Sequence, residues 1–255
     1  MLPTTVELPP AEAPTQGVLA SARQLDGEWW RGVKFRTDGC AEPTLQGPCP
    51  ADVAGSPIRP DEATFWPVAI RQGASCSALS GTDVELVASR RLDWSREWAV
   101  ARELQTGFWS DRDAPPGADG NPSLAGGVVV EAGNHAPTRA LALLEQAGSN
   151  QLHGQRLFLH SSPLIASFLL EAGTIWRDGR RWRTVLGNVL VVSPGYQGVD
   201  LYVTGEVFAA TARREVLLEH DRTVNDSIAW ADEVGIAVFD PCWHGRVSTD
   251  ITDLT

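Results

Sequence analysis

Long apolar runs are missing from this sequence of 255 residues, and no segment approaches the roughly eighteen consecutive apolar residues that a membrane-spanning helix needs. The opening segment, MLPTTVELPPAEAP, contains neither a basic stretch nor an apolar core, so we expect no secretory signal. The cysteines Cys40, Cys49, Cys76 and Cys242 are too few and too scattered for a disulfide scaffold. We therefore expect synthesis in the cytosol, and we interpret Cys76 and Cys242 as buried thiols.

Lysine is almost absent, since Lys34 is the only lysine among 21 basic residues. Acidic residues outnumber basic ones, and the formal net charge is −11 at pH 7. Binding of nucleic-acid phosphates needs a clustered basic face, so this charge argues against a protein dedicated to gripping DNA. An acidic wall that encloses DNA without recognising its sequence is compatible with the composition.

Motifs for nucleophilic catalysis are lacking. His160, Ser161 and Ser162 place a base beside two hydroxyls, but neighbours on a strand point to opposite faces, and no G-x-S-x-G elbow occurs. We interpret Ser161 or Ser162 as a helix cap. We predict no catalytic residue and no enzyme activity, with a hydrolase built on His160 and Ser161 as an open alternative.

The sequence also contains no complete metal-binding motif. Cys242-x-His244 could place a thiolate and an imidazole near one ion, but the sequence distances to the other cysteines fit no zinc motif. Asp111, Asp113 and Asp119 crowd one segment, yet only two of them have the spacing of a calcium loop. We predict no metal and no cofactor, and a metalloenzyme that uses Cys242 and His244 is the open alternative.

Tryptophan, by contrast, is abundant, with ten residues. Large aromatic side chains are favoured where surfaces meet, so this excess indicates either subunit contacts or a tryptophan-rich core. A chain of 255 residues forms one large or two small folding units and can bury a sizeable core unaided.

The first part of the chain predicts an arm and a projecting hairpin. Residues 1–26 are rich in proline, alanine and glutamate without a period, which indicates an extended arm. Two strands, Trp29–Thr37 and Thr64–Gln72, are held apart by a long irregular segment. Pro67 places the second strand at an edge or a bulge.

A long helix is predicted from Thr82 to Gly107. Thr82 and Glu85 have the spacing of a capping box, and Gly107 supplies the C-terminal stop. The stripe predicted to face the core consists of Val84, Val87, Ala88, Trp94, Trp98 and Leu104.

The remainder alternates helices and strands and ends in strands alone. We expect helices at Pro137–Ala147, stopped by Gly148, and at Leu164–Ala172. Asp178-Gly179 predicts a tight hairpin. The expected strands are Arg156–His160, Thr174–Arg177, Arg180–Val185, Gly187–Tyr196, Leu201–Thr211, Arg213–His220 and Asn225–Pro241.

A strand led by Gly187, the Val203-Thr204-Gly205 step, Asn225, Asp232-Glu233 and Pro241 follow one another in the last third of the chain. This pattern resembles the closing sequence of HK97-fold capsid proteins. The resemblance implies an α+β fold class with an N-terminal arm, an extended β-hairpin (E-loop), a peripheral domain with a long spine helix and an axial α/β domain. The implied bounds are 1–27 for the arm, 28–76 for the E-loop, 77–124 and 201–255 for the peripheral domain, and 125–200 for the axial domain.

The resemblance also implies a function. A structural major capsid protein self-assembles as hexamers and pentamers of an icosahedral shell around phage double-stranded DNA, in the virion, after assembly in the host cytoplasm. Scaffolding, portal or decoration proteins would be its partners, and no membrane is involved. Fewer than thirty residues precede the first strand, so scaffolding would be a separate chain or absent. The alternatives are an encapsulin-type compartment and a phage tail or baseplate protein.

Some shells of this fold join their subunits by an isopeptide bond between a lysine of the E-loop and an asparagine of the peripheral domain, helped by a buried carboxylate. Lys34 falls on the expected E-loop, and Asn225 and Glu233 fall in the returning strands. The resemblance therefore implies a possible cross-link between subunits through these three residues.

Overall fold

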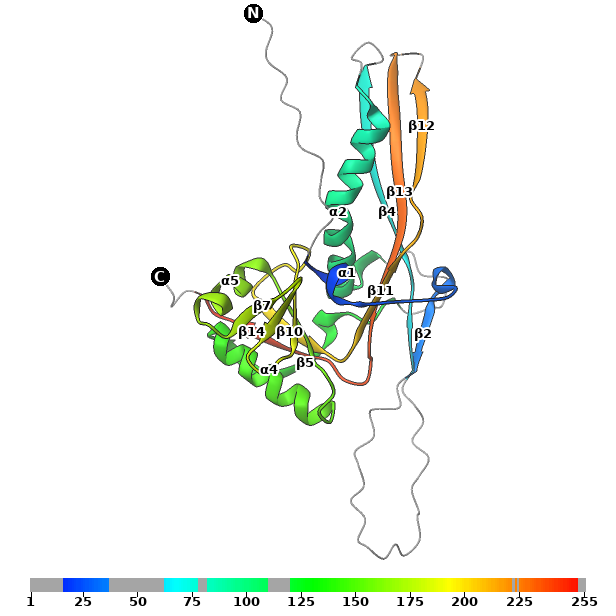
Figure 1. Ribbon diagram of the computed structural model, residues 1–255. Helices are drawn as coiled ribbons and strands as arrows, with labels where there is room; N and C mark the ends of the chain where they lie inside the picture. Colours follow the sequence, from blue (N-terminus) through cyan, green and yellow to red (C-terminus); the bar gives the residue numbers. More distant parts are fainter. Residues whose placement is uncertain are drawn as a thin grey trace, which may run out of the picture.

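A computed structural model describes residues 16–36, 62–77, 82–109, 120–221, 223 and 225–251 of the chain. Much of the expected arm, the hairpin tip with Cys40 and Cys49, and the aspartates Asp111, Asp113 and Asp119 lie outside the described residues. The described chain has an elongated part and a more compact part, each built on one β-sheet (Figure 1).

Strand β13 (Asp226–Phe239) is the central strand of the elongated part. Strand β4 (Val68–Ser77) pairs with it in antiparallel fashion along one side. On the other side lie β12 (Glu215–Asp221), near the outer end, and β11 (Val207–Thr211), near the base. The short strand β1 (Arg23–Gln24) adds to β11 in parallel.

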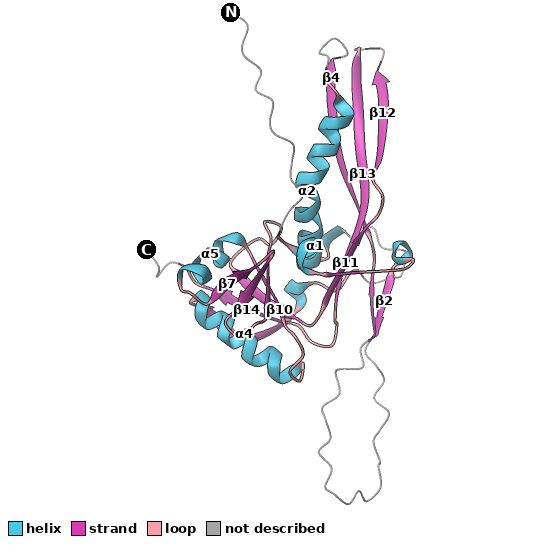
Figure 2. Ribbon diagram, viewed as in Figure 1, coloured by secondary structure: helices cyan, strands magenta, loops and turns pink. Residues whose placement is uncertain are grey.

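Helix α2 (Val84–Thr106) packs along one face of this sheet (Figures 1 and 2). The helix begins after Asp83, whose side chain accepts a backbone hydrogen bond in the first turn, so the predicted capping box of Thr82 and Glu85 is wrong. Gly107 ends the helix in the left-handed conformation, with φ 63, as the sequence predicted.

The buried face of α2 matches the predicted stripe in part, since Val84, Ala88 and Leu104 are buried as expected and Trp94 and Trp98 are not. Ala88 and Leu92 are buried, whereas Trp94 is 51% exposed and Trp98 is 36% exposed. Two positions along a helix differ in direction by about 200°, so the burial of Leu92 turns Trp94 outwards. The expectation that the two tryptophans belong to the core is therefore wrong.

The projecting hairpin starts as a two-stranded sheet of β2 (Val33–Arg36) and β3 (Glu62–Phe65). Residues Trp29–Arg31 form a 3-10 turn (η1) where the sequence predicted the start of a strand. The strand predicted at 64–72 is split, and β3 ends before Pro67, which has no N–H to donate to a ladder.

The compact part is a mixed seven-stranded sheet with helices α4 (Pro137–Gln151) and α5 (Pro163–Glu171). Both helices and the β7–β8 hairpin were predicted from the sequence, and a 3-10 turn, η2 (Leu124–Gly126), precedes the sheet. The strand order is β5 (Val128–His135), β14 (Gly245–Thr249), β10 (Asp200–Thr204), β6 (Phe158–Ser161), β9 (Val189–Val192), β8 (Arg181–Thr184) and β7 (Ile175–Asp178).

Two strands of the seven-stranded sheet come from residues 201–255, a segment that was expected to pack with α2 in the elongated part. Strands β10 and β14 belong to 201–255, which the resemblance assigned to the peripheral domain with α2, but they pair with each other and with β6 and β5. The segment 201–255 therefore contributes strands to both sheets. The residues of β10 after Asp200 are buried because the strand has sheet neighbours on both sides.

Two apolar clusters form the core. One lies under α2 and reaches the near face of the seven-stranded sheet, and the other fills the space between that sheet and its helices. Gly148 lies inside α4, where a Cβ would come within 2.9 Å of Leu157 and 3.2 Å of Val203, so this glycine permits close packing and is not the predicted stop. Among the described residues, no helix combines the length and the apolar character needed to cross a bilayer.

Candidate functional site

The three residues predicted to cross-link subunits lie in different places. Lys34 is exposed on β2. Asn225 is exposed in the turn between β12 and β13, in the left-handed conformation with φ 55. Glu233 is buried on β13, and eight strand residues at about 3.3 Å each put it roughly 26 Å from Asn225. Within one chain, the structure therefore does not bring the three residues together.

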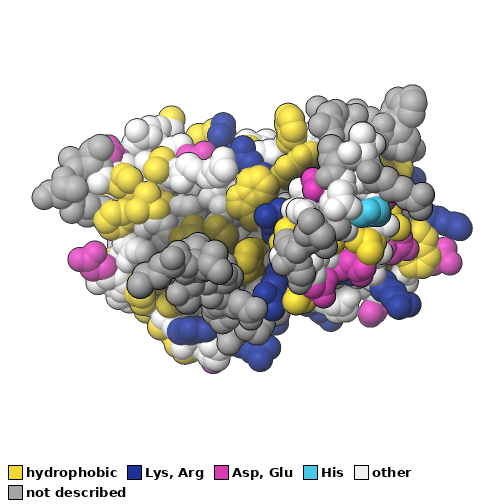
Figure 3. Space-filling model, turned by 90° about the horizontal axis from the view of Figure 1, so that it is seen from above, with side chains coloured by type: hydrophobic (Ala, Val, Ile, Leu, Met, Phe, Trp, Pro, Cys, Tyr) yellow, Lys and Arg dark blue, Asp and Glu magenta, His cyan; other side chains and the backbone are white. Residues whose placement is uncertain are grey.

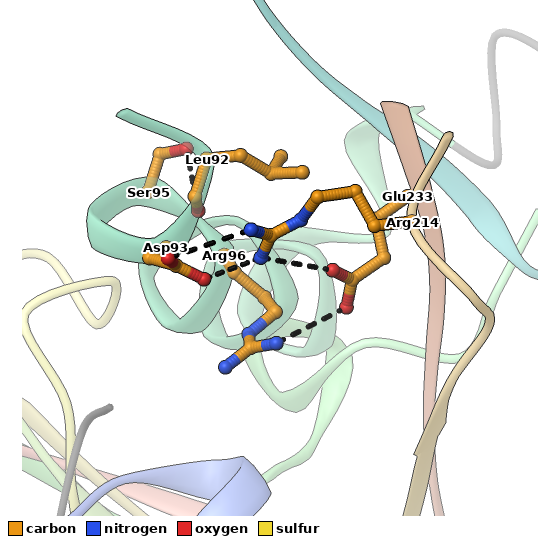
Figure 4. A network of polar contacts seen from close by, with 6 residues as sticks. All are labelled: Leu92, Asp93, Ser95, Arg96, Arg214 and Glu233. Atoms are coloured by element: carbon orange, nitrogen blue, oxygen red, sulfur yellow. Dashed lines mark hydrogen bonds and ion pairs between the residues drawn. The ribbon is translucent and has the colours of Figure 1, made fainter. Parts of the chain in front are cut away.

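Glu233 instead binds two arginines (Figure 4). Its Oε1 lies 3.4 Å from Nη1 of Arg96 on α2, and its Oε2 lies 3.6 Å from Nη2 of Arg214, the residue before β12. The guanidinium of Arg214 also pairs with Asp93 on α2. This network of ion pairs joins α2, β13 and the start of β12.

A second buried carboxylate holds the first described helix, α1 (Val18–Ser21). Glu97 on α2 accepts hydrogen bonds from the backbone N–H of Val18 at 2.6 Å and of Leu19 at 3.0 Å. Burial raises the pKa of Glu97 to about 7, although these hydrogen bonds favour the ionised form. Since 4.5 is its ordinary value, this carboxyl contributes stability that is complete below pH 4.5 and is lost as the pH rises through about 7.

His160, the base of the hydrolase alternative, is completely buried on β6. Its Nδ1 lies 2.8 Å from the Tyr196 hydroxyl and its Nε2 lies 3.0 Å from the Thr204 hydroxyl. Thr204 donates its own proton to the carbonyl of Gly205, so Nε2 donates to Thr204 and Nδ1 accepts from Tyr196. Burial lowers the pKa of His160 to about 3. Ser161 is also fully buried, so the hydrolase alternative has no accessible nucleophile.

Cys242 and His244 do not form the alternative metal site. Cys242 is disulfide-bonded, so its interpretation as a thiol is wrong. Spacing along the chain carries no information on such a bond, because bridged cysteines are neighbours in space. His244 packs on Phe239 at 5.0 Å between ring centroids, and burial lowers its pKa. Within the described part of the chain, no group of three or more potential ligands is placed to hold a metal ion.

Exposed aromatic side chains follow the outer side of α2 and its C-terminal end. The exposed Trp94, Trp98 and Phe108, together with the partly buried Trp109, are named here the aromatic ridge. Trp98 and Phe108 contact Trp109 edge to face, with ring centroids 6.0 and 6.1 Å apart. A cavity of about 250 Å³ beside them is lined by Trp98, Arg102, Thr106, Phe108 and Trp109. Exposed apolar patches of this kind mark surfaces that contact another protein.

The outer end of the five-stranded sheet carries further exposed apolar side chains, Leu217 and Trp230 on one face and Leu218 on the other, which are together named the sheet tip. Leu217 and Trp230 are cross-strand neighbours, and the indole covers Gly73 of β4, where a Cβ would come within 2.5 Å. Every residue of β12 is exposed and the strand lies at the sheet edge, so one row of its backbone groups is open. Seen from above, hydrophobic side chains lie between charged ones on this surface (Figure 3).

Sequence reasoning placed Trp94 and Trp98 of the ridge on the stripe facing the core, and it did not single out the sheet tip. One signal was present for the ridge, because Trp94 and Trp98 are four residues apart and share one helix side. For the sheet tip, the signal was the run Val216-Leu217-Leu218 in β12. In a half-buried strand apolar and polar residues alternate, so three consecutive apolar residues indicate that both faces of the strand have the same environment, either buried or exposed.

A scan against protein-family models finds no match, and a search of curated proteins finds no relative. Solved structures do match. The capsid of a native GTA particle aligns with a TM-score of 0.63 at 13% identity, over 98% of this chain and 95% of that chain. A chain of Mycobacterium phage Che8 aligns with a TM-score of 0.57 at 14% identity, over 97% of this chain and 96% of that chain. The SrpI encapsulin of Synechococcus elongatus PCC 7942 aligns with a TM-score of 0.56 at 9% identity, over 98% and 94%.

Identities at this level establish the fold alone. The matched structures comprise phage-type capsids and an encapsulin, and each alignment spans nearly the whole length of both chains. The chain therefore has the HK97-like capsid fold, an α+β fold, as the closing strands of the sequence predicted.

Proposed function

We propose that this chain is the shell subunit of a phage-type capsid, which assembles as hexamers and pentamers into an icosahedral container for double-stranded DNA. One observation carries the proposal. The capsid fold extends over nearly the whole chain, and a single copy leaves the aromatic ridge and the sheet tip uncovered. Large exposed apolar surfaces are typical of sites where another protein binds, and in a shell that protein is a second copy of the subunit.

The proposal gives each part of the fold a task. Helix α2 would be the spine of the peripheral domain, and β2 and β3 would form the base of the E-loop. The projecting elements have few partners in their own chain, so part of their stability would be gained only on association. A closed ring needs head-to-tail contact between two different surfaces, and the aromatic ridge and the sheet tip are two such surfaces.

The contents of the shell are part of the proposal. DNA would be enclosed without sequence recognition, in a virion that is assembled in the host cytoplasm with portal, scaffolding or decoration proteins. The similarity to the SrpI encapsulin favours a second candidate, a compartment that holds protein cargo. Particles that protect DNA from nuclease would support the capsid, and particles that retain a bound protein would support the compartment.

Negative-stain microscopy of the expressed full chain tests the assembly. We expect closed polyhedral particles from the natural sequence. Trp94→Asp should lower the particle yield about tenfold or more, because a carboxylate would be buried at the centre of a contact. Leu86→Asp is the matched control on the same helix, outside the aromatic ridge, and should assemble. A purified chain that stays a compact monomer at every concentration would refute the shell, and open rings would indicate a tail or baseplate protein.

A covalent cross-link is a separate prediction. The Nζ of Lys34 in one copy would attack the side-chain amide carbon of Asn225 in another, which forms an isopeptide bond and releases ammonia. Both side chains are exposed, as a reaction between copies requires. Glu233, the predicted assisting carboxylate, would have to act from within its pairs with Arg96 and Arg214.

Denaturing electrophoresis of assembled particles checks this bond. We expect a ladder of multimers from the natural chain and one band near 27.5 kDa from Lys34→Arg, which keeps the charge but removes the nucleophilic amine. A single band from the natural chain would end the idea without affecting the proposed shell.

A further inference from the structure

The β7–β8 hairpin is a strongly basic segment of an acidic protein. Residues 175–184 read IWRDGRRWRT. The four arginines and the single aspartate of this segment carry +3, so the rest of the chain carries −14 of the total of −11. A polyanion is therefore repelled by most of the molecule and attracted to this hairpin.

The backbone of the hairpin concentrates these side chains. Strands β7 and β8 pair in antiparallel register, with Trp176 opposite Arg183 and Asp178 opposite Arg181. A two-residue turn closes the hairpin, and Gly179 provides its left-handed conformation with φ 60. The four arginines thus lie on two short adjacent strands and the turn between them, with Arg181 and Arg183 on the sheet face of Trp176 and Arg177 on the other face beside Trp182.

Only one of the four arginines is neutralised within the hairpin. Arg183 Nε lies 2.7 Å from Oδ2 of Asp178, and this pair fixes the two strands to each other. Arg177 donates to the carbonyl of Gly179 and lies over the ring of Trp182, 5.9 Å from its centroid. Among the described residues, Arg177, Arg180 and Arg181 have no carboxylate within ion-pair distance. Three guanidinium groups are therefore available to an external anion.

An aromatic side chain and an open strand edge accompany these charges. Trp176 is 48% exposed, although it lies on a strand that begins with the buried Ile175. Strand β7 is the terminal strand of the seven-stranded sheet, so the N–H groups along its outer edge have no strand partner. Guanidinium groups beside an exposed indole form the kind of surface on which nucleic-acid strands bind, through phosphates and stacked bases.

We propose that the β7–β8 hairpin is a binding site for the phosphate backbone of nucleic acid, with Arg177, Arg180 and Arg181 as phosphate ligands and Trp176 as a stacking surface for an unpaired base. The inference rests on the proposed function only for the source of the nucleic acid: the enclosed double-stranded DNA would be held through its phosphates by the arginines, and Trp176 would add to binding only where a strand is unpaired. It gives an acidic shell one defined point of attachment to its contents.

The main rival occupant is an acidic surface of a second copy. Arginine and tryptophan also occur in contacts between proteins, but an acidic surface would have to place several carboxylates over the four arginines of residues 177–183, whereas a nucleic-acid strand carries one phosphate charge at every nucleotide. Three of the four arginines also have no carboxylate partner among the residues that the structure describes. These observations favour a ligand that brings many closely spaced negative charges.

Fluorescence anisotropy with a labelled single-stranded DNA of mixed sequence tests the site on the full chain. Three phosphate contacts predict a salt slope of about −2, which is roughly a twentyfold loss of affinity between 50 and 200 mM salt. The variant with Arg177→Ala, Arg180→Ala and Arg181→Ala should lose most of this affinity and its salt dependence. The matched control removes three exposed arginines elsewhere, at Arg31, Arg156 and Arg213, and should bind within about twofold of the natural chain.

A second experiment distinguishes the contribution of base stacking from that of the phosphate contacts. Trp176→Ala should weaken binding to the single strand about tenfold and leave binding to a duplex of the same length almost unchanged, because paired bases cannot stack on the indole. Particle formation is followed in parallel by microscopy. Failure of the natural chain to bind either DNA would overturn this site while leaving the shell intact. A triple hairpin variant that binds DNA normally but no longer assembles would also overturn it and would assign the hairpin to a second copy.

Discussion

Replacement of Glu233 by alanine is expected to lower the free energy of unfolding by about 3–5 kcal/mol, one of the largest single effects in this chain. The Glu233 side chain is 1% exposed, and the side chains of Arg96 and Arg214 are 21% and 25% exposed. Removal of the carboxylate leaves two largely desolvated guanidinium groups beside each other, with only Asp93 to balance them. Urea unfolding of dissociated subunits measures this loss.

Asp232→Ala is the matched control, because Asp232 is the adjacent residue on β13 and points to the opposite face. It pairs with Arg71 at 2.6 Å, but the Arg71 side chain is 62% exposed, so solvent screens the pair and it contributes little to stability. Equal losses from the two variants would show that the buried network contributes no more than a surface ion pair.

The Glu233 network also bears on assembly. Its residues come from α2, β13 and the position before β12, and these three elements carry the aromatic ridge and most of the sheet tip. A looser network would let the two surfaces move relative to each other. We therefore expect the Glu233→Ala subunit to form fewer closed particles even under conditions in which it remains folded.

Local signals in the sequence predicted much of the secondary structure. Gly107 ended a helix and Asp178-Gly179 closed a hairpin, because both depend on backbone conformations within a few residues. Strand pairing was harder to predict. The assignment of β10 to its sheet depends on the pairing of Val203 with Leu159, residues that are far apart in the chain, and no local pattern encodes such a contact.

The candidate surfaces also depend on contacts between residues that are far apart in the chain, which local sequence patterns do not predict. Counting apolar residues placed Trp94 in the core, whereas the side of a helix that becomes buried depends on what packs against it. Glu233 was selected from the sequence as a reactive carboxylate, and its partner Arg96 comes from a helix 137 positions away. The charge of the β7–β8 hairpin was visible in the sequence, but its lack of carboxylate partners required the structure.

The second large effect is expected on acidification and comes from His160. The folded-state pKa of about 3 lies below the ordinary value of 6.5, so the unfolded chain binds a proton in a pH range where the folded protein does not. This histidine therefore contributes stability that is complete above pH 6.5 and is lost as the pH falls, by about 3 kcal/mol at pH 4. Protonation would also remove the acceptor that Nδ1 provides to Tyr196, so the hydrogen-bonded core resists it.

The comparison with His160→Gln isolates this contribution from other titrating groups, including Glu97, whose effect has the opposite sign. Glutamine offers one acceptor and one donor group to Tyr196 and Thr204 but does not titrate in this range. We expect the stability of the natural chain relative to this variant to fall by about 3 kcal/mol between pH 7 and pH 4 in urea unfolding experiments. A difference between the natural chain and His160→Gln that stays constant over this range would mean that His160 is charged in the folded core, and the tautomer assigned from Thr204 would then be wrong.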